Sequence, residues 1–242
     1  MKKLLFIFFV LSYSIVTNAQ DRVDSASLID YSIESFLYNW NHPTTKGPTI
    51  TDSVDQLLVV FREHYSDMKL AGVEKENGIW KLKLAPVRAS IGRNGLIYAP
   101  GKKEGDGCTP SGIFALGELF SYEPTIPSNL PFTQSTPEDK WIDDTASNDY
   151  NKHIRGVTNA KSYENLLLKS IHYKYCMVIE YNTNPIVKGK GSAIFFHVAD
   201  EKYSATAGCV AIKESDMLQY LNWLQSNKRK AIWIMADEEE ED

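Results

Sequence analysis

Hydrophobic and polar positions alternate along much of this chain, and this pattern predicts a mainly β protein with a few helices. Apolar or alternating runs bounded by turn residues occur at 57–61, 79–84, 87–91, 177–181, 193–198 and 231–235. Asn77-Gly78 separates two of these regions and is the residue pair most typical of a tight hairpin turn. We therefore expect a β-rich body around one principal core.

Helical spacing of apolar residues is found in three places. Residues 24–40 predict an amphipathic helix near the amino terminus, and 163–169 and 215–224 predict two more. The apolar stripe of the last segment, which contains Met217 and Leu221, is more typical of a core than of a functional site. No internal repeat is present.

The amino-terminal 19 residues have the pattern of a secretory signal peptide. Lys2-Lys3 precede an apolar run that is shorter than the ~20 residues of a membrane-spanning helix, and small residues follow it. No cysteine follows Ala19, so we expect a periplasmic or otherwise exported protein without a stable membrane anchor after cleavage. The expected organisation is a signal peptide at 1–19, an N-terminal helix and linker at 20–50, one catalytic domain at 51–236 and an acidic tail at 237–242.

Charge and residue spacing exclude several functions. The net charge is −5, and the six consecutive acidic residues at the carboxyl terminus contribute −6, so the rest of the chain is close to neutral and has no basic stripe that would suit nucleic acid. Gly105-Asp106-Gly107 lacks the Gly-Lys-Ser/Thr of a phosphate loop and is interpreted as a scaffold turn. The histidines lack metal-ligand spacing, so no metal and no cofactor is expected.

His197 and Cys209 carry the candidate chemistry. In an extended strand, His197 points away from the face of Phe196 and Val198, and Cys209 points away from the face of Val210. If the loop between them folds these segments side by side, the imidazole and the thiol share a surface and come within hydrogen-bond reach. An imidazolium neighbour would lower the pKa of the thiol below its usual ~8.5.

The backbone around the cysteine supports a catalytic role, although a purely structural role remains an alternative. Gly208 permits close approach of a carbonyl, and the N–H groups of Gly208 and Cys209 are candidate oxyanion donors. A single strand cysteine is more often a small buried hydrophobic residue. Of the three cysteines, Cys108 and Cys176 either pair in an oxidising compartment or remain single, while Cys209 must be free to react.

Several motifs in order resemble the L,D-transpeptidase (YkuD-type) catalytic domain, in a divergent Thr-Ala-Gly-Cys branch. The resemblance covers roughly residues 54–236. Ala211 stands where many members have arginine, and Ala207 replaces a histidine. The matching residues are Ile91-Gly92-Arg93-Asn94-Gly95, Gly105 to Phe114, Trp141-Ile142-Asp143-Asp144, Ser147, Tyr150-Asn151, Gly189 to His197 and Thr206 to Cys209.

The resemblance implies a β-sandwich catalytic domain and a cysteine acyltransferase that acts on peptidoglycan stem peptides. Cys209 would form a thioester and His197 would act as general base. Hydrolysis of the same bond by an L,D-carboxypeptidase or amidase, and a non-catalytic cell-wall-binding module, are the alternatives. The candidate substrate-binding residues are Arg93, Arg155, Tyr203, Ser204 and Thr206.

Overall fold

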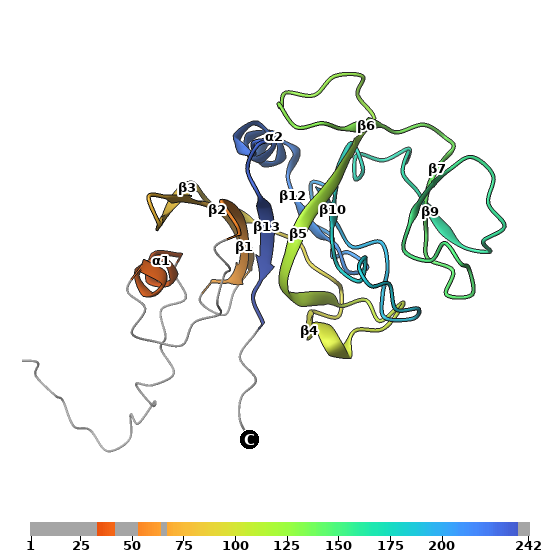
Figure 1. The fold of residues 1–242 in the computed structure, drawn as a ribbon, viewed down its shortest axis with the longest axis horizontal. Helices are drawn as coiled ribbons and strands as arrows, with labels where there is room; N and C mark the ends of the chain where they lie inside the picture. Colours follow the sequence, from red (N-terminus) through yellow and green to blue (C-terminus); the bar gives the residue numbers. More distant parts are fainter. Residues whose placement is uncertain (1–32, 42–52, 64–66, 237–242) are drawn as a thin grey trace, which may run out of the picture. The chain divides into compact units, whose positions relative to one another are not determined.

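The computed structural model describes residues 33–41, 53–63 and 67–236, and the predicted signal peptide, linker and acidic tail lie outside these ranges (Figure 1). Two α-helices, α1 (Ile33–Asn41) and α2 (Glu214–Trp223), and a short 3-10 helix η1 (Ala99–Gly101) are present in this part. None of its helices has both the length and the apolar character needed to cross a membrane. The mainly β prediction is confirmed.

One curled sheet contains ten of the strands. Its path runs β12-β11-β10-β5-β13-β1-β2-β3, with β4 and β6 paired to β5. The long strand β5 lies at the centre of Figure 1 and joins the two parts of the sheet. The strands are β1 (Gln56–Arg62), β2 (Met68–Glu76), β3 (Ile79–Arg88), β4 (Leu96–Tyr98), β5 (Thr109–Ser121), β6 (Thr133–Gln134), β10 (Tyr175–Ile179), β11 (Phe195–Val198), β12 (Val210–Ile212) and β13 (Lys230–Ile234).

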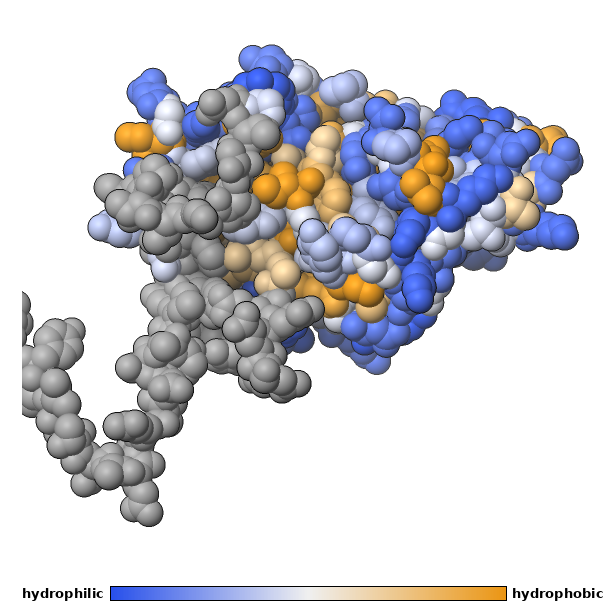
Figure 2. All heavy atoms as spheres, turned by 60° about the horizontal axis from the view of Figure 1, so that its bottom comes forward, coloured by the Kyte–Doolittle hydropathy of each residue, from blue (hydrophilic) through white to orange (hydrophobic). Residues whose placement is uncertain are grey.

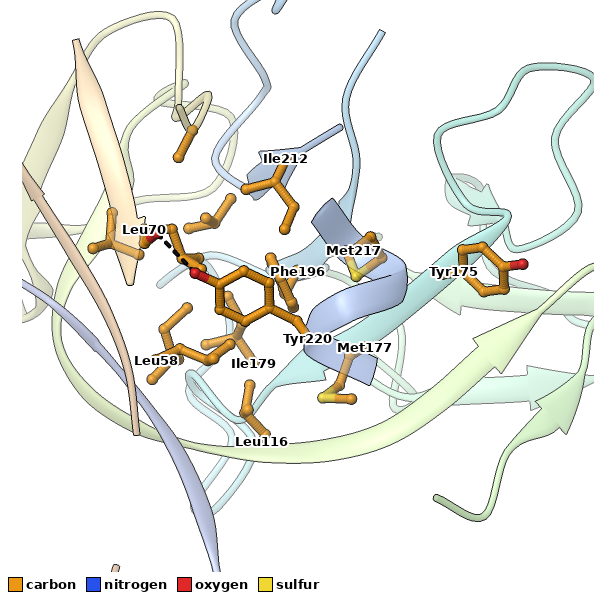
Figure 3. Packing of buried hydrophobic residues seen from close by; sticks show 14 of the residues in the cluster. Leu58, Leu70, Leu116, Tyr175, Met177, Ile179, Phe196, Ile212, Met217 and Tyr220 are labelled. Carbon is orange, nitrogen blue, oxygen red and sulfur yellow. Dashed lines mark hydrogen bonds between the residues drawn. The ribbon is translucent and has the colours of Figure 1, made fainter. Parts of the chain in front are cut away.

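The main core lies between the two parts of this sheet, so that the expected sandwich is formed by one continuous, folded sheet. Leu58 of β1 and Phe196 of β11 belong to the same fully buried cluster. Helix α2 contributes Met217 and Leu221 to it, as predicted from its apolar stripe, and also Tyr220 (Figure 3). The Tyr220 hydroxyl donates to the Leu70 carbonyl at 2.9 Å, which satisfies its one polar group inside the core.

The β2–β3 hairpin and α1 form the other end of the sheet. Asn77 and Gly78 both have positive φ, as a tight hairpin turn requires, so this prediction is confirmed. Helix α1 packs on β3, where Asn41 both donates to and accepts from the backbone of Trp80. The strand expected at 79–84 and the first two residues of the one expected at 87–91 form one strand, β3, with irregular pairing near Leu84, while Ser90 makes an isolated bridge to Ala211.

A separate three-stranded sheet has the order β8-β7-β9, from β7 (Asp139–Ile142), β8 (His153–Arg155) and β9 (Tyr163–Asn165). The helix predicted at 163–169 is therefore wrong. The Leu166 N–H donates to the Asp139 carbonyl and the Leu168 N–H donates to the Tyr122 hydroxyl, so neither makes a helical hydrogen bond. Around this sheet, the surface in Figure 2 is mainly hydrophilic, with small separate hydrophobic patches.

Candidate active site

The two candidate catalytic residues lie on the same face of the curled sheet. Strands β11 and β12 are parallel neighbours in which Phe196 pairs with Val210 and His197 pairs with Ala211. Phe196 and Val210 are fully buried in the main core. Because side chains alternate along a strand, His197 and the residue before Val210, Cys209, face the opposite side. The shared face predicted from the sequence is confirmed.

The Cys209 thiol is held by the backbone of β11 and the residues just before it. Sγ accepts a hydrogen bond from the Phe195 N–H at 3.4 Å and donates to the Ala193 carbonyl at 3.3 Å. The register of the strands brings Cys209 level with Phe195 rather than with His197. In the described part of the chain, the thiol's hydrogen bonds therefore go to backbone groups, and the predicted direct hydrogen bond to the imidazole is absent.

Burial decides the protonation state of this thiol. Cys209 is 5% exposed, and this burial raises the pKa of its thiol, with a further rise from the negative charge of Glu164. The positive charge of Lys102 and the Phe195 N–H act in the opposite direction, but less strongly. The lowered thiol pKa expected from the sequence is thus wrong for this structure, because desolvation outweighs every group that favours the thiolate.

His197 is held in one tautomer. Its Nδ1 lies 2.9 Å from the Val198 carbonyl oxygen, which can only accept, so Nδ1 carries the proton and Nε2 has a lone pair. Burial lowers the pKa of His197 to about 4, although hydrogen bonds to backbone carbonyls partly offset this. At neutral pH the imidazole is therefore an uncharged base.

The turn before Cys209 is fixed by Gly208 and Thr206. Gly208 has φ +151°, and a Cβ at this position would come 2.9 Å from the Cys108 carbonyl oxygen. The Thr206 hydroxyl donates to the Cys209 carbonyl at 2.7 Å and accepts the Gly208 N–H at 3.1 Å. One of the two expected oxyanion donors, the Gly208 N–H, is thus already paired, which leaves the Cys209 N–H as the stronger candidate.

A cavity of about 450 Å³ opens over this face of the sheet. Its lining brings together the thiol, the imidazole and three of the predicted substrate-binding residues, namely Arg93, Ser204 and Thr206. The arrangement offers a candidate nucleophile and a neutral base in one pocket that has both polar and apolar walls. That combination suits acyl transfer through a thioester.

Comparison with known families identifies the domain. The family model YkuD, described as the L,D-transpeptidase catalytic domain, matches residues 58–232, a range that includes His197 and Cys209. The chain belongs to this family. The comparisons with curated proteins and with solved structures found no match.

Two predicted substrate-binding residues lie elsewhere in this L,D-transpeptidase domain. Arg155 donates from Nε and Nη2 to the carboxylate of the fully buried Asp139, at 2.8 and 3.0 Å. The Tyr203 ring lies against the cations of Arg88 and Lys213, at 4.8 and 5.5 Å. Neither side chain lines the cavity. The structure gives Arg155 a structural partner that the sequence did not reveal.

Several cavity residues of the L,D-transpeptidase domain were missed from the sequence. Lys102 is 2% exposed, and its Nζ lies 2.5 Å from Asp106 Oδ1, which explains the Gly105-Asp106-Gly107 turn as a support for a buried cation. Glu104 accepts hydrogen bonds from Tyr150 and Ser192. The only signal in the sequence was the presence of charged residues within a glycine-rich turn.

Glu164 and Tyr173 were missed for a different reason. Both line the cavity, and the Tyr173 hydroxyl donates to Glu164 Oε2. Glu164 belongs to β9, inside the segment that was predicted to be helical. Because residues 163–169 were wrongly predicted to be helical, Glu164 was not recognised as a residue of the site.

The three cysteines are not joined by disulfide bonds. Cys108, Cys176 and Cys209 are all free thiols, with Cys176 fully buried and Cys108 partly exposed. Of the two alternatives for Cys108 and Cys176, the structure therefore has single thiols.

Among residues 33–41, 53–63 and 67–236, no three His, Cys, Asp or Glu side chains gather as metal ligands would.

Proposed function

We propose that this protein is an exported L,D-transpeptidase that acts on peptidoglycan stem peptides through a Cys209 thioester, with His197 as general base. The observation that carries the proposal is that Cys209 and a tautomerically fixed, neutral His197 line one cavity of a YkuD-family domain. Export rests on the signal-peptide pattern at 1–19.

The protonation states favour proton transfer during attack rather than a preformed ion pair. The resting thiol is neutral because burial raises its pKa, and the resting imidazole is neutral because burial lowers its pKa. As Cys209 Sγ attacks the carbonyl of the L-centre of the third stem residue, its proton moves to His197 Nε2. The negative charge then lies on the carbonyl oxygen, where the Cys209 N–H is the candidate donor.

The remaining steps return the enzyme to its starting state. The bond to the terminal D-residue breaks, and the proton on His197 goes to the leaving amine, which gives a thioester on Cys209. An amine of a second stem peptide attacks the thioester, its proton passes to His197, and the new amide forms as the Cys209 thiolate leaves and recovers the proton. Attack by water in place of the amine gives the carboxypeptidase outcome.

The arginine of the cavity suits the anionic part of such a substrate. Arg93 lines the cavity and its backbone N–H donates to the Thr206 carbonyl, which ties it to the turn before the nucleophile. A guanidinium binds carboxylate through two parallel hydrogen bonds. We assign Arg93 to a carboxylate of the stem peptide, with Ser204 and Thr206 beside it.

One observation favours a second candidate, a cell-wall-binding module without catalysis. The Cys209 thiol is 5% exposed, and burial together with the Glu164 charge raises its pKa. A buried, protonated thiol of this kind is ordinarily inert. Thiol reactivity separates this candidate from the enzyme.

The deciding experiment is mass spectrometry of a defined disaccharide-tetrapeptide after incubation with the purified protein. Wild type is compared with Cys209→Ala and with Cys108→Ala, which removes a thiol that does not line the cavity. Dimers that require Cys209 but not Cys108 support the transpeptidase. Loss of the terminal residue without dimers makes the protein a hydrolase, and binding without turnover supports the wall-binding module.

A further inference from the structure

A buried tyrosine beside the candidate base connects the two sheets. Tyr173 is 6% exposed, and its hydroxyl donates a short hydrogen bond to Glu164 Oε2. Tyr173 precedes β10 of the curled sheet, whereas Glu164 lies in β9 of the three-stranded sheet. The hydrogen bond therefore fixes the position of the tyrosine ring relative to both sheets.

The Tyr173 ring in turn contacts the imidazole. Its centroid lies 5.4 Å from that of His197, with an angle of 77° between the rings, and 5.5 Å from that of Phe195. The hydrogen bond from Nδ1 to Val198 fixes one side of the imidazole, and any remaining motion of the ring consists of small changes in the two side-chain torsions of His197. Edge contacts from Tyr173 and from His172, whose ring centroid lies 5.9 Å away, limit these changes in the torsions.

The direction of the Glu164–Tyr173 hydrogen bond follows from the surroundings. Burial raises the pKa of Tyr173 well above its usual value, with further contributions from nearby negative groups, so its hydroxyl stays protonated and donates. Glu164 is the acceptor, and burial also raises the pKa of its carboxyl. An amide oxygen at this position could accept the same hydrogen bond, which separates the acceptor role of Glu164 from its charge.

We propose that Glu164, acting through Tyr173, is a positioning residue that aims the imidazole of His197 in the Cys209–His197 pair. This inference rests on the proposed function, since it assigns a role within the same site. Glu164 holds the Tyr173 hydroxyl, the Tyr173 ring fixes the plane of the imidazole, and Nε2 is thereby kept in one direction. A residue of the three-stranded sheet thus helps to orient His197.

Tyr173→Phe tests the positioning role, with Tyr220→Phe as the matched control. Each substitution removes one buried tyrosine hydroxyl and its hydrogen bond, but the Tyr220 hydroxyl bonds to Leu70 in the main core and Tyr220 does not line the cavity. We expect Tyr173→Phe to lower kcat about tenfold with KM unchanged, because misaimed catalytic groups lose rate rather than binding. Tyr220→Phe is expected to keep the wild-type kcat while lowering Tm at least as much.

Glu164→Gln separates the hydrogen bond that Glu164 accepts from Tyr173 from the effect of its negative charge on Cys209. The amide keeps an acceptor for Tyr173, so kcat is expected to stay within about threefold of wild type, whereas Glu164→Leu lowers kcat like Tyr173→Phe. Removing the negative charge that raises the Cys209 pKa should also shift the pH profile of Cys209 alkylation by iodoacetamide to lower pH. Glu138→Gln, an exposed carboxylate outside the cavity, should leave that profile unchanged.

The outcomes are distinguishable from failure of the proposed function. Turnover that persists in Cys209→Ala contradicts the proposed function itself. Wild-type kcat in both Tyr173→Phe and Glu164→Leu, or equal losses of kcat in Tyr173→Phe and Tyr220→Phe, overturns the positioning role alone. If the wild type does not turn over the peptide, the pH profile of Cys209 alkylation is compared between Tyr173→Phe and the wild type. An unchanged profile contradicts any control of the Cys209–His197 pair by this tyrosine.

Discussion

Gly208 and Cys108 approach so closely that a Cβ on Gly208 would lie 2.9 Å from the Cys108 carbonyl oxygen. This contact places the turn before Cys209 against the segment that enters β5. Because the neighbouring atom belongs to the backbone, it cannot move aside as the end of a side chain can. The close contact thus sets the position of Cys209 in the cavity.

Gly208→Ala is expected to displace this turn. The substitution combines an unfavourable φ of +151° with the backbone clash, so we expect a loss of about 1–3 kcal/mol in the free energy of unfolding and a fall in kcat of at least tenfold. Gly189→Ala is the control, since Gly189 also has positive φ but has no atom near its Cβ position. Denaturant titration and steady-state kinetics measure both effects. An equal fall in kcat for the two variants would contradict a specific role of the contact.

Part of this arrangement could be predicted from the sequence because it follows from local periodicity. Alternation along β11 and β12 placed His197 and Cys209 on one face, since Phe196, Val198, Val210 and Ile212 have to fill the core. The Asn77-Gly78 turn was equally predictable, because few residues adopt positive φ at both positions.

The rest depends on partners that are distant along the chain. The N–H groups of Leu166 and Leu168 bond to Asp139 and Tyr122, and the apolar spacing of 163–169 contains no trace of these acceptors. The burial that reverses the expected thiol pKa arises in the same way. It comes from the packing of Cys209 in a hydrophobic cluster separate from the main core, which also contains Trp141 and Leu166.

The two arginines predicted to bind substrate should respond differently to substitution. Arg93→Met removes a guanidinium from the cavity, so we expect KM for the tetrapeptide to rise about tenfold with Tm nearly unchanged. Arg155→Met leaves the buried carboxylate of Asp139 without its main partner, so Tm should fall and KM should stay the same. Steady-state kinetics and thermal unfolding of both variants check this. A raised KM in Arg155→Met would instead support the prediction that Arg155 binds substrate.

Asp139 should contribute to stability against acid. Burial by itself raises its pKa, but hydrogen bonds from Arg155, Thr136 and His153 outweigh this and hold the pKa below the usual 3.8. A carboxyl whose folded pKa is lowered stabilises the fold above its unfolded pKa, and this stabilisation is lost as the pH falls below about 4.

Asp139→Asn is therefore expected to reduce the free energy of unfolding by roughly 2–4 kcal/mol at pH 7 and to flatten its decrease between pH 5 and pH 2. Asp149→Asn removes an exposed carboxylate paired with Lys152 and should change stability by less than about 1 kcal/mol. Urea unfolding at a series of pH values gives both quantities. A parallel pH dependence in Asp139→Asn and wild type would show that another group controls acid unfolding.

The pH profile of turnover should report the buried environment of His197. Burial lowers its pKa to about 4, so the neutral imidazole that can accept the thiol proton predominates at every pH above that value. We expect kcat/KM to rise with pH along a limb centred near 4 and to be level through neutrality, rather than to rise near the usual 6.5. The measurement is the rate of loss of the terminal residue in buffers of constant ionic strength, with folding verified at each pH by circular dichroism. A limb near 6.5 would mean that water reaches the imidazole in the working enzyme, because a hydrated ring no longer bears the desolvation that lowers its pKa.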